Sequence, residues 1–530
     1  MTRIDVEDFE RQLEVRPIRI DDYDRLVELQ HACFPGMEPW SRKQLESQLR
    51  MFAPGQICVT LDGEIVASSS SLIVDFDHYE DFHDWKVISD NGYIRNHDDE
   101  GDTLYGIEIM VDPQCRGLKL ARRLYDARKA LARELNLRSI IIGGRIPGYG
   151  RHAREMTARE YVEKVMDKTL YDPVLTAQLA NGFQLRRLIP NYLPDDSESK
   201  GYATFLAWDN LDYEPPGKRR FRAVSNIRLC VVQYMMRPID YFESFKTQIE
   251  YFVDTASDYK CDFVVFPELI TSQLLATFRG DRPAQAVRKL AEYTPKYLET
   301  FRDLAMRYAV NIVGGSQFTL EDDQLYNVAY LFRRDGTIGK QYKIQPTADE
   351  RRWWGVVGGQ QVQIFDSDRG KLAILVGYDI QFPELARWAR QQGASLIFCP
   401  FTTDERHSFL AIRNCAQARA IENHVYVACA GATGTLPFVD NADVHFAQSG
   451  IYTPCDFAFA RDGIAAEACA NSEDVIFQDL DVALLKRSVA TGTAQTWLDR
   501  RTDLYEVRFR QPAAEHEEGG LDLPPGGDAR

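Results

Sequence analysis

The chain has 530 residues, of which 45% are hydrophobic, and it carries a formal net charge of −16 with an isoelectric point near 5.2. That length predicts roughly two to four domains with sizeable cores. The acidic balance argues against a general nucleic-acid or anionic-membrane surface.

The ten cysteines are spread singly, without Cys-x-x-Cys spacing, which favours reduced thiols and argues against a zinc site or a disulfide framework. The first residues are acidic where a secretory signal needs basic and then apolar residues. No apolar run reaches the roughly 18 residues of a membrane span. We therefore expect a cytoplasmic protein with no metal, no membrane segment and no nucleic-acid partner.

A strand, a turn and a helix form the most informative part of the N-terminal region. Tyr105–Val111 alternates as a strand, Asp112–Cys115 makes a turn, and Arg116–Ala121 leads into a helix with one apolar face. This order places consecutive backbone N–H groups at a helix N-terminus, where the amides and the helix dipole can hold a pyrophosphate.

The loop Arg116-Gly117-x-Lys119-x-Ala121 resembles the acetyl-CoA loop of the GNAT acetyltransferases, usually Arg/Gln-x-x-Gly-x-Gly/Ala. Many strand-turn-helix units contain Arg-Gly, but Val15–Leu29, the hairpin at Asp62–Ser68 and Asn181–Phe183 resemble further elements of that family. Lys119 replaces the middle glycine, so we expect acetyl-CoA affinity that is weaker than typical, or partly rescued by the lysine charge near the phosphates. The resemblance implies an acetyl-CoA site made by Val111, Arg116, Gly117, Leu118, Lys119, Leu120 and Ala121.

Glu108 stands on the strand beside which this family presents an amine to the acetyl thioester. The resemblance makes it a candidate base for acetyl transfer, although a glutamate on an alternating strand can equally be a solvent-face residue. The segment Gly143–Tyr149 reads as an irregular loop that lines the acceptor cleft or is merely a turn.

A Pro-Pro-Gly sequence at residues 215–217 and the basic cluster Lys218–Arg222 predict a linker. The expected domains are residues 1–212, a linker 213–225, a second domain 226–509 and a disordered tail 510–530, which is rich in Pro, Gly and acidic residues.

The second domain contains a nucleophile-bearing strand-to-turn pattern in which the nucleophile is missing. Leu372–Val376 reads as a buried strand, and helical spacing resumes at Leu385, so Gly377 falls near the turn between them. Upstream, Glu268 ends an apolar run, and Lys343 lies in an alternating segment that stops at Pro346. Thiol-based amide cleavage needs such a carboxylate base and such a cation for the oxyanion.

These segments resemble the nitrilase, or carbon-nitrogen hydrolase, superfamily, whose triad is Glu, Lys and Cys in that chain order. Phe-Pro-Glu268 matches its glutamate motif, Tyr-Lys343-Ile-Gln-Pro-Thr-Ala-Asp-Glu350 its lysine motif, and Tyr378–Glu384 the segment directly after its cysteine. The resemblance implies a catalytic set of Glu268, Lys343 and Glu350, with Gly377 at the cysteine position. Alone, a strand ending in Pro-Glu is usually only a strand end, and a lone lysine is more often solvated.

The implied fold class is α/β, with a GNAT-like mixed sheet with helices followed by a nitrilase-like α-β-β-α sandwich. The implied function is that of a bifunctional-type protein, an acetyl-CoA-dependent N-acetyltransferase fused to an amide or nitrile hydrolase that lacks hydrolase activity because Gly377 has no side chain. The resemblance also implies small-molecule amine and amide substrates and a homodimer or larger homo-oligomer formed through the second domain.

Three interpretations of Gly377 remain open. The domain is a nucleophile-deleted form that keeps its pocket, or another thiol substitutes, for which Cys399 is the candidate, or the domain is a non-catalytic small-molecule-binding or scaffold module. A nucleophile displaced by one strand would lose alignment with Glu268 and Lys343, which counts against Cys399.

Overall fold

The structure is a computed structural model that describes residues 6–35, 37–75, 85–115, 117–193, 196–213, 226–437, 439 and 442–508. The predicted linker, apart from Tyr213, and the predicted tail lie outside the described residues. The domain boundaries therefore stay predictions. Within the described ranges, none of the helices combines the length and the apolar composition that crossing a bilayer requires.

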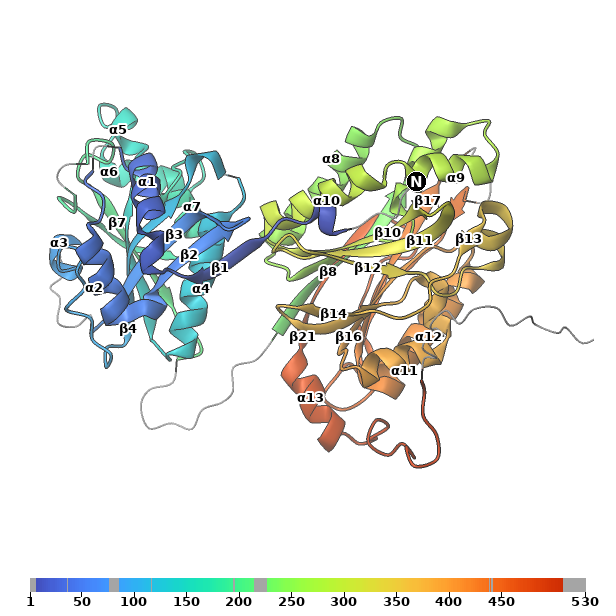
Figure 1. Cartoon of the computed structure of the whole chain (residues 1–530). Helices are drawn as coiled ribbons and strands as arrows, with labels where there is room; N and C mark the ends of the chain where they lie inside the picture. The colour runs from blue at the N-terminus through green and yellow to red at the C-terminus, as the bar shows by residue number, and fades with distance from the viewer. Residues whose placement is uncertain are drawn as a thin grey trace, which may run out of the picture.

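The first domain is built on one seven-stranded mixed sheet with the strand order β1-β2-β3-β4-β5-β7-β6 (Figure 1). Its strands are β1 (Leu13–Pro17), β2 (Gln56–Leu61), β3 (Glu64–Val74), β4 (Thr103–Val111), β5 (Ser139–Arg145), β6 (Gln184–Ile189) and β7 (Ala203–Asp209). Its helices are α1 (Tyr23–Cys33), α2 (Arg42–Phe52), α3 (Trp85–Ile88), α4 (Leu120–Glu134), α5 (Tyr149–His152), α6 (Ala158–Met166) and α7 (Leu175–Ala180). β4 and β5 run parallel and α4 connects them, which confirms the predicted strand-turn-helix unit and the mixed sheet.

Two local sequence features shape this sheet. Asp62 and Gly63 both have positive φ and form the two-residue turn between β2 and β3, which confirms the predicted hairpin. The prediction of a loop from Gly143 is wrong, because β5 continues to Arg145. Gly143 lacks a side chain for a packing reason, since a Cβ there would overlap the hydroxyl of Tyr192.

The second domain contains two sheets that join where the ends of β8 and β17 pair. One sheet holds β8 (Asn226–Met236), β9 (Phe263–Val265), β10 (Asn311–Glu321), β11 (Gln324–Phe332), β12 (Ile338–Tyr342), β13 (Val356–Val357) and β21 (Asp474–Asp481). The other holds β14 (Ile364–Ser367), β15 (Gly370–Ile374), β16 (Leu396–Phe401), β17 (Tyr426–Thr435), β19 (Gly450–Tyr452) and β20 (Ile464–Glu467), and β18 (Val444–His445) pairs with β17.

Helices cover the outer faces of both sheets (Figure 1). α8 (Phe242–Asp258), α9 (Pro283–Ala291) and α10 (Thr294–Tyr308) pack on the first sheet, and α11 (Pro383–Gln391) and α12 (Arg406–Asn423) pack on the second. A third apolar cluster, with Val265 and Ile374 among its members, fills the space between the sheets. α13 (Val482–Thr491) follows β21. The predicted α-β-β-α sandwich is thereby confirmed.

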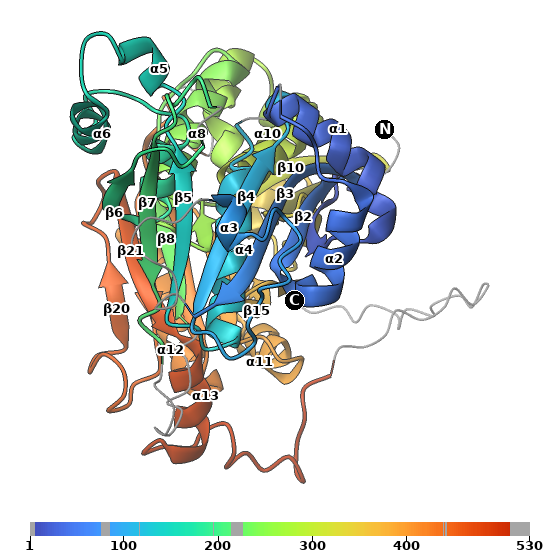
Figure 2. The same ribbon diagram turned by 90° about the vertical axis from the view of Figure 1, so that its left-hand side faces the viewer.

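The two domains meet along a contact that the sequence does not predict, which we call the domain seam: Leu13, Lys119, Leu120, Arg123, Leu124, Ser257 and Met306. Leu13, Leu120 and Leu124 form one apolar cluster with Met306 of α10. The Leu13 amide donates to the Asp335 carbonyl at 2.8 Å. In Figure 2, in which the first domain faces the viewer, α8 and α10 lie behind its sheet.

A buried arginine crosses the domain seam. Arg123 of α4 donates to the main-chain carbonyl of Met306 at 3.0 Å and to that of Arg334. Burial lowers the pKa of Arg123 to about 10, with Arg334 adding to the effect. The seam therefore combines apolar burial with hydrogen bonds that desolvation strengthens.

Candidate functional site

The predicted hydrolase residues meet at one end of the sandwich. Glu268 follows β9, Lys343 follows β12, and Gly377 opens the short turn Gly377–Gln381 after β15. Glu350 begins the helical turn Glu350–Trp354. Because these strands, which belong to both sheets, end on the same side of the sandwich, residues far apart in the chain come into contact there.

Lys343 lies between two carboxylates. Its Nζ donates to Oε1 of Glu268 and to Oε2 of Glu350, both at 2.7 Å. All three side chains are buried, with Lys343 2% exposed. The structure thus brings together the glutamate, the lysine and the second glutamate that the motifs predicted.

Two further residues hold Glu268, and the sequence analysis missed both. Asn327 on β11 donates at 2.9 Å to Oε1 of Glu268 and Oε1 of Glu350. The Thr402 amide, just after β16, donates to Oε2 of Glu268 at 3.0 Å. Asn327 could have been found, because it interrupts a face of β11 that continues with Ala329 and Leu331 in the core between the sheets.

Gly377 completes this arrangement with a backbone conformation typical of a strained turn. Its φ is +49°, in the left-handed region that side chains seldom adopt. A Cβ at residue 377 would overlap Oε2 of Glu268. The carboxylate of Glu268 therefore fills the position that a Cβ of residue 377 would take.

Asp379 ties the turn to the lysine segment. Its carboxylate accepts the amides of Ile344, Gln345 and Val376, at 3.1, 2.7 and 3.4 Å. Burial raises the pKa of Asp379 to about 6, against the opposing effects of Lys343 and of these amides. This residue therefore fixes the spacing between residue 377 and the ammonium of Lys343.

The pKa values of the two glutamates are shifted in opposite directions. Burial raises the pKa of Glu268, and the neighbouring Glu350 adds to that rise while Lys343 opposes it. Burial alone would also raise the pKa of Glu350, but Lys343 and the hydrogen bonds to Glu350 hold it below its usual value. Burial alone would lower the pKa of Lys343, but the two carboxylates raise it. Glu268 is therefore the carboxylate better suited to accept a proton.

Cys399 is poorly suited to replace the missing thiol. It is fully buried on β16 in the apolar cluster beneath α11 and α12, opposite Cys429 on β17. Burial raises its thiol pKa well above the usual value, with Cys429 adding to the rise. A thiol kept protonated in an apolar layer is a weak nucleophile.

The predicted acetyl-CoA loop lies at the start of α4. Arg116 lies outside the described residues, whereas Gly117 is exposed with φ +100°. A Cβ at residue 117 would meet no heavy atom within 4 Å. Leu118 is partly buried and Leu120 fully buried against the sheet, Ala121 packs on the neighbouring core, and Val111 ends β4. The first amides of α4 have no acceptor inside the helix.

The side chain of Lys119 contacts the second domain. Its Nζ donates to Ser257 Oγ at 2.9 Å, lies 3.8 Å from Asp254, and stands 4.6 Å from the centroid of the Tyr308 ring. Lys119 is therefore one of the contacts of the domain seam, and an effect of its charge on the phosphates stays a prediction.

Glu108 is half-buried on β4 and is not a freely solvated residue. Its Oε1 accepts the indole N–H of Trp40 at 2.8 Å. Burial raises its pKa to about 7, with Trp40 and Arg128 opposing the rise. A carboxyl that titrates near neutrality and is held by a fixed donor has the properties of a general base.

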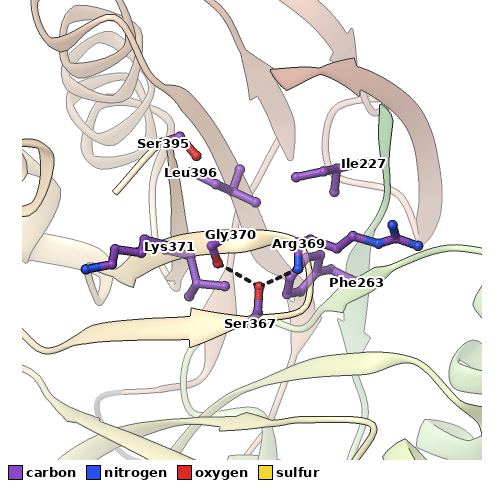
Figure 3. A pocket seen from close by; sticks show the side chains of 9 residues that line it. Ile227, Phe263, Ser367, Arg369, Gly370, Lys371, Ser395 and Leu396 are labelled. Atoms are coloured by element: carbon purple, nitrogen blue, oxygen red, sulfur yellow. Dashed lines mark hydrogen bonds between the residues drawn. The ribbon is translucent and has the colours of Figure 1, made fainter. Parts of the chain in front are cut away.

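The pocket of Figure 3 lies at the other end of the second domain. It is lined by Ile227, Phe263, Ser367, Arg369, Gly370, Lys371, Leu372, Ser395 and Leu396, residues at or near the beginning of β15 and β16. Gly377 and Thr402 follow the ends of those strands. Among the described residues, no group of three or more His, Cys, Asp or Glu side chains could hold a metal ion.

Comparison with known proteins gives a separate family match for each of the two domains. Residues 23–153 match the model of the acetyltransferase (GNAT) family, and residues 228–488 match that of the carbon-nitrogen hydrolases. The probable hydrolase YhcX of Bacillus subtilis is 51% identical over 96% of this chain and 99% of its own length. The uncharacterized N-acetyltransferase YkwB of the same organism is 37% identical over 38% of this chain and 91% of its length.

Among solved structures, an amidase from Nesterenkonia sp. covers 54% of this chain and 96% of its own, with 22% identity and a TM-score of 0.43. The match to YhcX extends through both domains, and each domain is matched separately by its family model. The chain therefore belongs to the carbon-nitrogen hydrolase family, in a fused form whose first domain is a GNAT acetyltransferase domain.

Proposed function

We propose that the chain is an acetyl-CoA-dependent N-acetyltransferase fused to a hydrolase domain whose site is assembled but has no nucleophile. The observation that carries the second half is the contact of Lys343 with Glu268 and Glu350 beside Gly377. The first half is supported by the open loop at Gly117 and by the near-neutral pKa of Glu108.

In acetyl transfer, the amine nitrogen bonds to the thioester carbonyl carbon, and the bond from that carbon to the CoA sulfur breaks. Glu108 accepts the proton that the amine loses, and the departing thiolate is protonated in turn. The amides at the start of α4 would hold the pyrophosphate, with Arg116, Gly117 and their neighbours up to Ala121 forming the loop. Small-molecule amines are the acceptors we propose.

In the second domain, a small-molecule amide would be bound without being cleaved. Glu268 is placed as the base and Lys343 as the oxyanion cation, but no thiol can form the acyl-enzyme. Loss of a nucleophile lowers the rate by about 10⁴ to 10⁶. A binding or scaffold role for this domain, including self-association of its outer helices, is compatible with the same geometry. Ammonia release by Gly377→Cys distinguishes the disarmed enzyme from that role.

Acetyl-CoA binding tests the first half of the proposal. We expect Gly117→Val to weaken binding at least tenfold in a calorimetric titration, because the side chain would enter the open space of the loop. Gly280→Val is the matched control, since Gly280 has φ +96° and a Cβ there would also meet nothing within 4 Å. Both variants carry similar backbone strain. Absence of binding by the unchanged chain at millimolar acetyl-CoA would remove the proposal.

Glu108→Gln tests the base. We expect kcat/KM for CoA release with an accepting amine to fall by about 10² to 10⁴, because the neutral amide cannot take the proton. In the unchanged protein the rate should rise as the pH passes about 7, where Glu108 loses its proton. Glu64→Gln is the control, an exposed glutamate of β3. Equal rates in both variants would show that Glu108 is not the base.

A further inference from the structure

Arg128 is an enclosed arginine in the middle of α4. It is 2% exposed, and its guanidinium donates to main-chain carbonyls. Burial lowers its pKa to about 10. Burying a charged group is energetically costly, and the hydrogen bonds to main-chain carbonyls offset part of that cost here.

The two carbonyls that Arg128 holds belong to paired residues on adjacent strands, directly beside an interruption in the pairing of β3 with β4. Nη2 donates to the Ser70 carbonyl on β3 at 2.7 Å and to the Glu108 carbonyl on β4 at 2.6 Å. Ser70 pairs with Glu108, but the next pair is Ser71 with Gly106, so Ile107 is an extra residue. Such a bulge bends the strand and redirects the side chains next to it.

Gly106 makes room for this arrangement. A Cβ at residue 106 would lie 2.5 Å from Nη1 of Arg128. The glycine is thus matched to the arginine across the helix-sheet contact. The indole of Trp85 donates to the Ile107 carbonyl at 3.3 Å, which fixes the extra residue from the other side.

We propose that Arg128 is a positioning residue for acetyl transfer, which anchors the bulge of β4 and holds Glu108 toward Trp40 in an ionisable state. The role of Arg128 in acetyl transfer rests on the proposed function, whereas its action on the bulge and on Glu108 does not. Arg128 acts on Glu108 in two ways. Its hydrogen bonds fix the main chain of residue 108, and its positive charge favours the ionised carboxylate.

Among the described residues, the groups around Glu108 come from α3, α4 and the segment before α2. Trp40, before α2, donates to the carboxylate, and Arg128 of α4 supplies the positive charge. Tyr125 of α4 interacts with Arg128, and burial raises the pKa of that phenol. Trp85 of α3 reaches the neighbouring carbonyl and packs 5.7 Å from Trp40, measured between ring centroids.

The indole N–H of Trp40 offers a direct readout of Glu108 in the full chain. The protein has seven tryptophans, so ¹⁵N-tryptophan labelling yields few indole signals, and Trp40→Phe identifies the relevant one. The Trp40 signal should titrate with pH as Glu108 loses its proton. In Glu108→Gln that titration should disappear.

We expect Arg128→Met to raise the midpoint of the Trp40 titration by about one pH unit, because the favourable charge is lost. Arg128→Lys keeps the charge but not the fork to two carbonyls, so its shift should be less than half as large. An unchanged midpoint in Arg128→Met would overturn the proposal, as would equal shifts in both variants. If the methionine variant does not fold, Gly106→Ala displaces the guanidinium, and the same upward shift is expected.

This titration needs no acetyl-CoA and no acceptor amine. A chain that shows the shift but neither binds acetyl-CoA nor releases CoA would refute the proposed function while leaving the action of Arg128 on Glu108 in place. A chain that transfers acetyl groups without the shift would refute only the role of Arg128.

Discussion

Gly377→Cys is expected to produce amide hydrolysis where the unchanged chain should show none, with a gain on the order of 10⁴ or more in ammonia release. Glu268 already stands at the Cβ position of residue 377, and Lys343 is joined to Glu268 by a 2.7 Å hydrogen bond. The new thiol should have a lowered pKa, because Lys343 lies close and Glu268 can take its proton. Iodoacetamide titration measures the thiol pKa, and ammonia release from a panel of amides and nitriles measures the hydrolysis.

The substitution also requires the carboxylate of Glu268 to move. A Cβ at residue 377 would overlap Oε2 of that residue, and the backbone has φ +49°. Gly377→Ala is the matched control, because it adds the Cβ without the thiol. We expect it to lower stability by about 1 to 3 kcal/mol and to release no ammonia.

If the cysteine variant folds, carries a reactive low-pKa thiol and still releases no ammonia from the panel, the interpretation as a disarmed enzyme fails. The scaffold interpretation of the second domain would then be the one to pursue. A cysteine variant that folds no better than the alanine control but hydrolyses amides would support the disarmed site.

Lys343→Met is expected to destabilise the second domain by about 3 to 5 kcal/mol at neutral pH, because two buried carboxylates lose their shared cation. Thermal or denaturant unfolding measures the loss. Lys371→Met is the control, since Lys371 is an exposed lysine of β15 and its replacement should change stability by less than about 0.5 kcal/mol.

The loss of stability in Lys343→Met should depend on pH in a definite direction. In the present chain Lys343 holds the pKa of Glu350 low, so its contribution to stability is present above the unfolded pKa and is lost as the pH falls through the folded value. Without Lys343 both carboxyl pKa values rise in the folded state. The defect should therefore be smallest near about pH 5 and grow as the pH increases. A pH-independent defect would show that packing, not charge, is lost.

Much of the hydrolase site could be predicted from the sequence because its residues stand at strand ends. Glu268, Lys343 and Gly377 each follow the end of a strand, and strand ends from both sheets meet at one end of the sandwich. The residues that were missed act from other elements. Asn327 and Thr402 reach Glu268 from β11 and from the end of β16, and no local pattern states which carboxylate they serve.

In the first domain, too, local patterns predict some of the site residues, and tertiary packing supplies the others. The loop at Gly117 and the strand of Glu108 follow from local patterns, whereas Trp40 and Arg128 are brought to Glu108 only by helix-to-sheet packing. Lys119 illustrates the limit most clearly. A lysine in an anion-binding loop suggests a phosphate contact, but here its partner is Ser257, 138 residues further along the chain.

We expect the domain seam to couple the unfolding of the two domains. Opening it would expose Leu13, Leu120 and Leu124 on one side and Met306 on the other, and it would leave the guanidinium of Arg123 without its carbonyl acceptors. A substitution in the first domain can thereby lower the melting temperature of the second domain, even where the substituted residue does not contact Glu268. Cooperativity of this kind would make the stability of the second domain depend on that of the first.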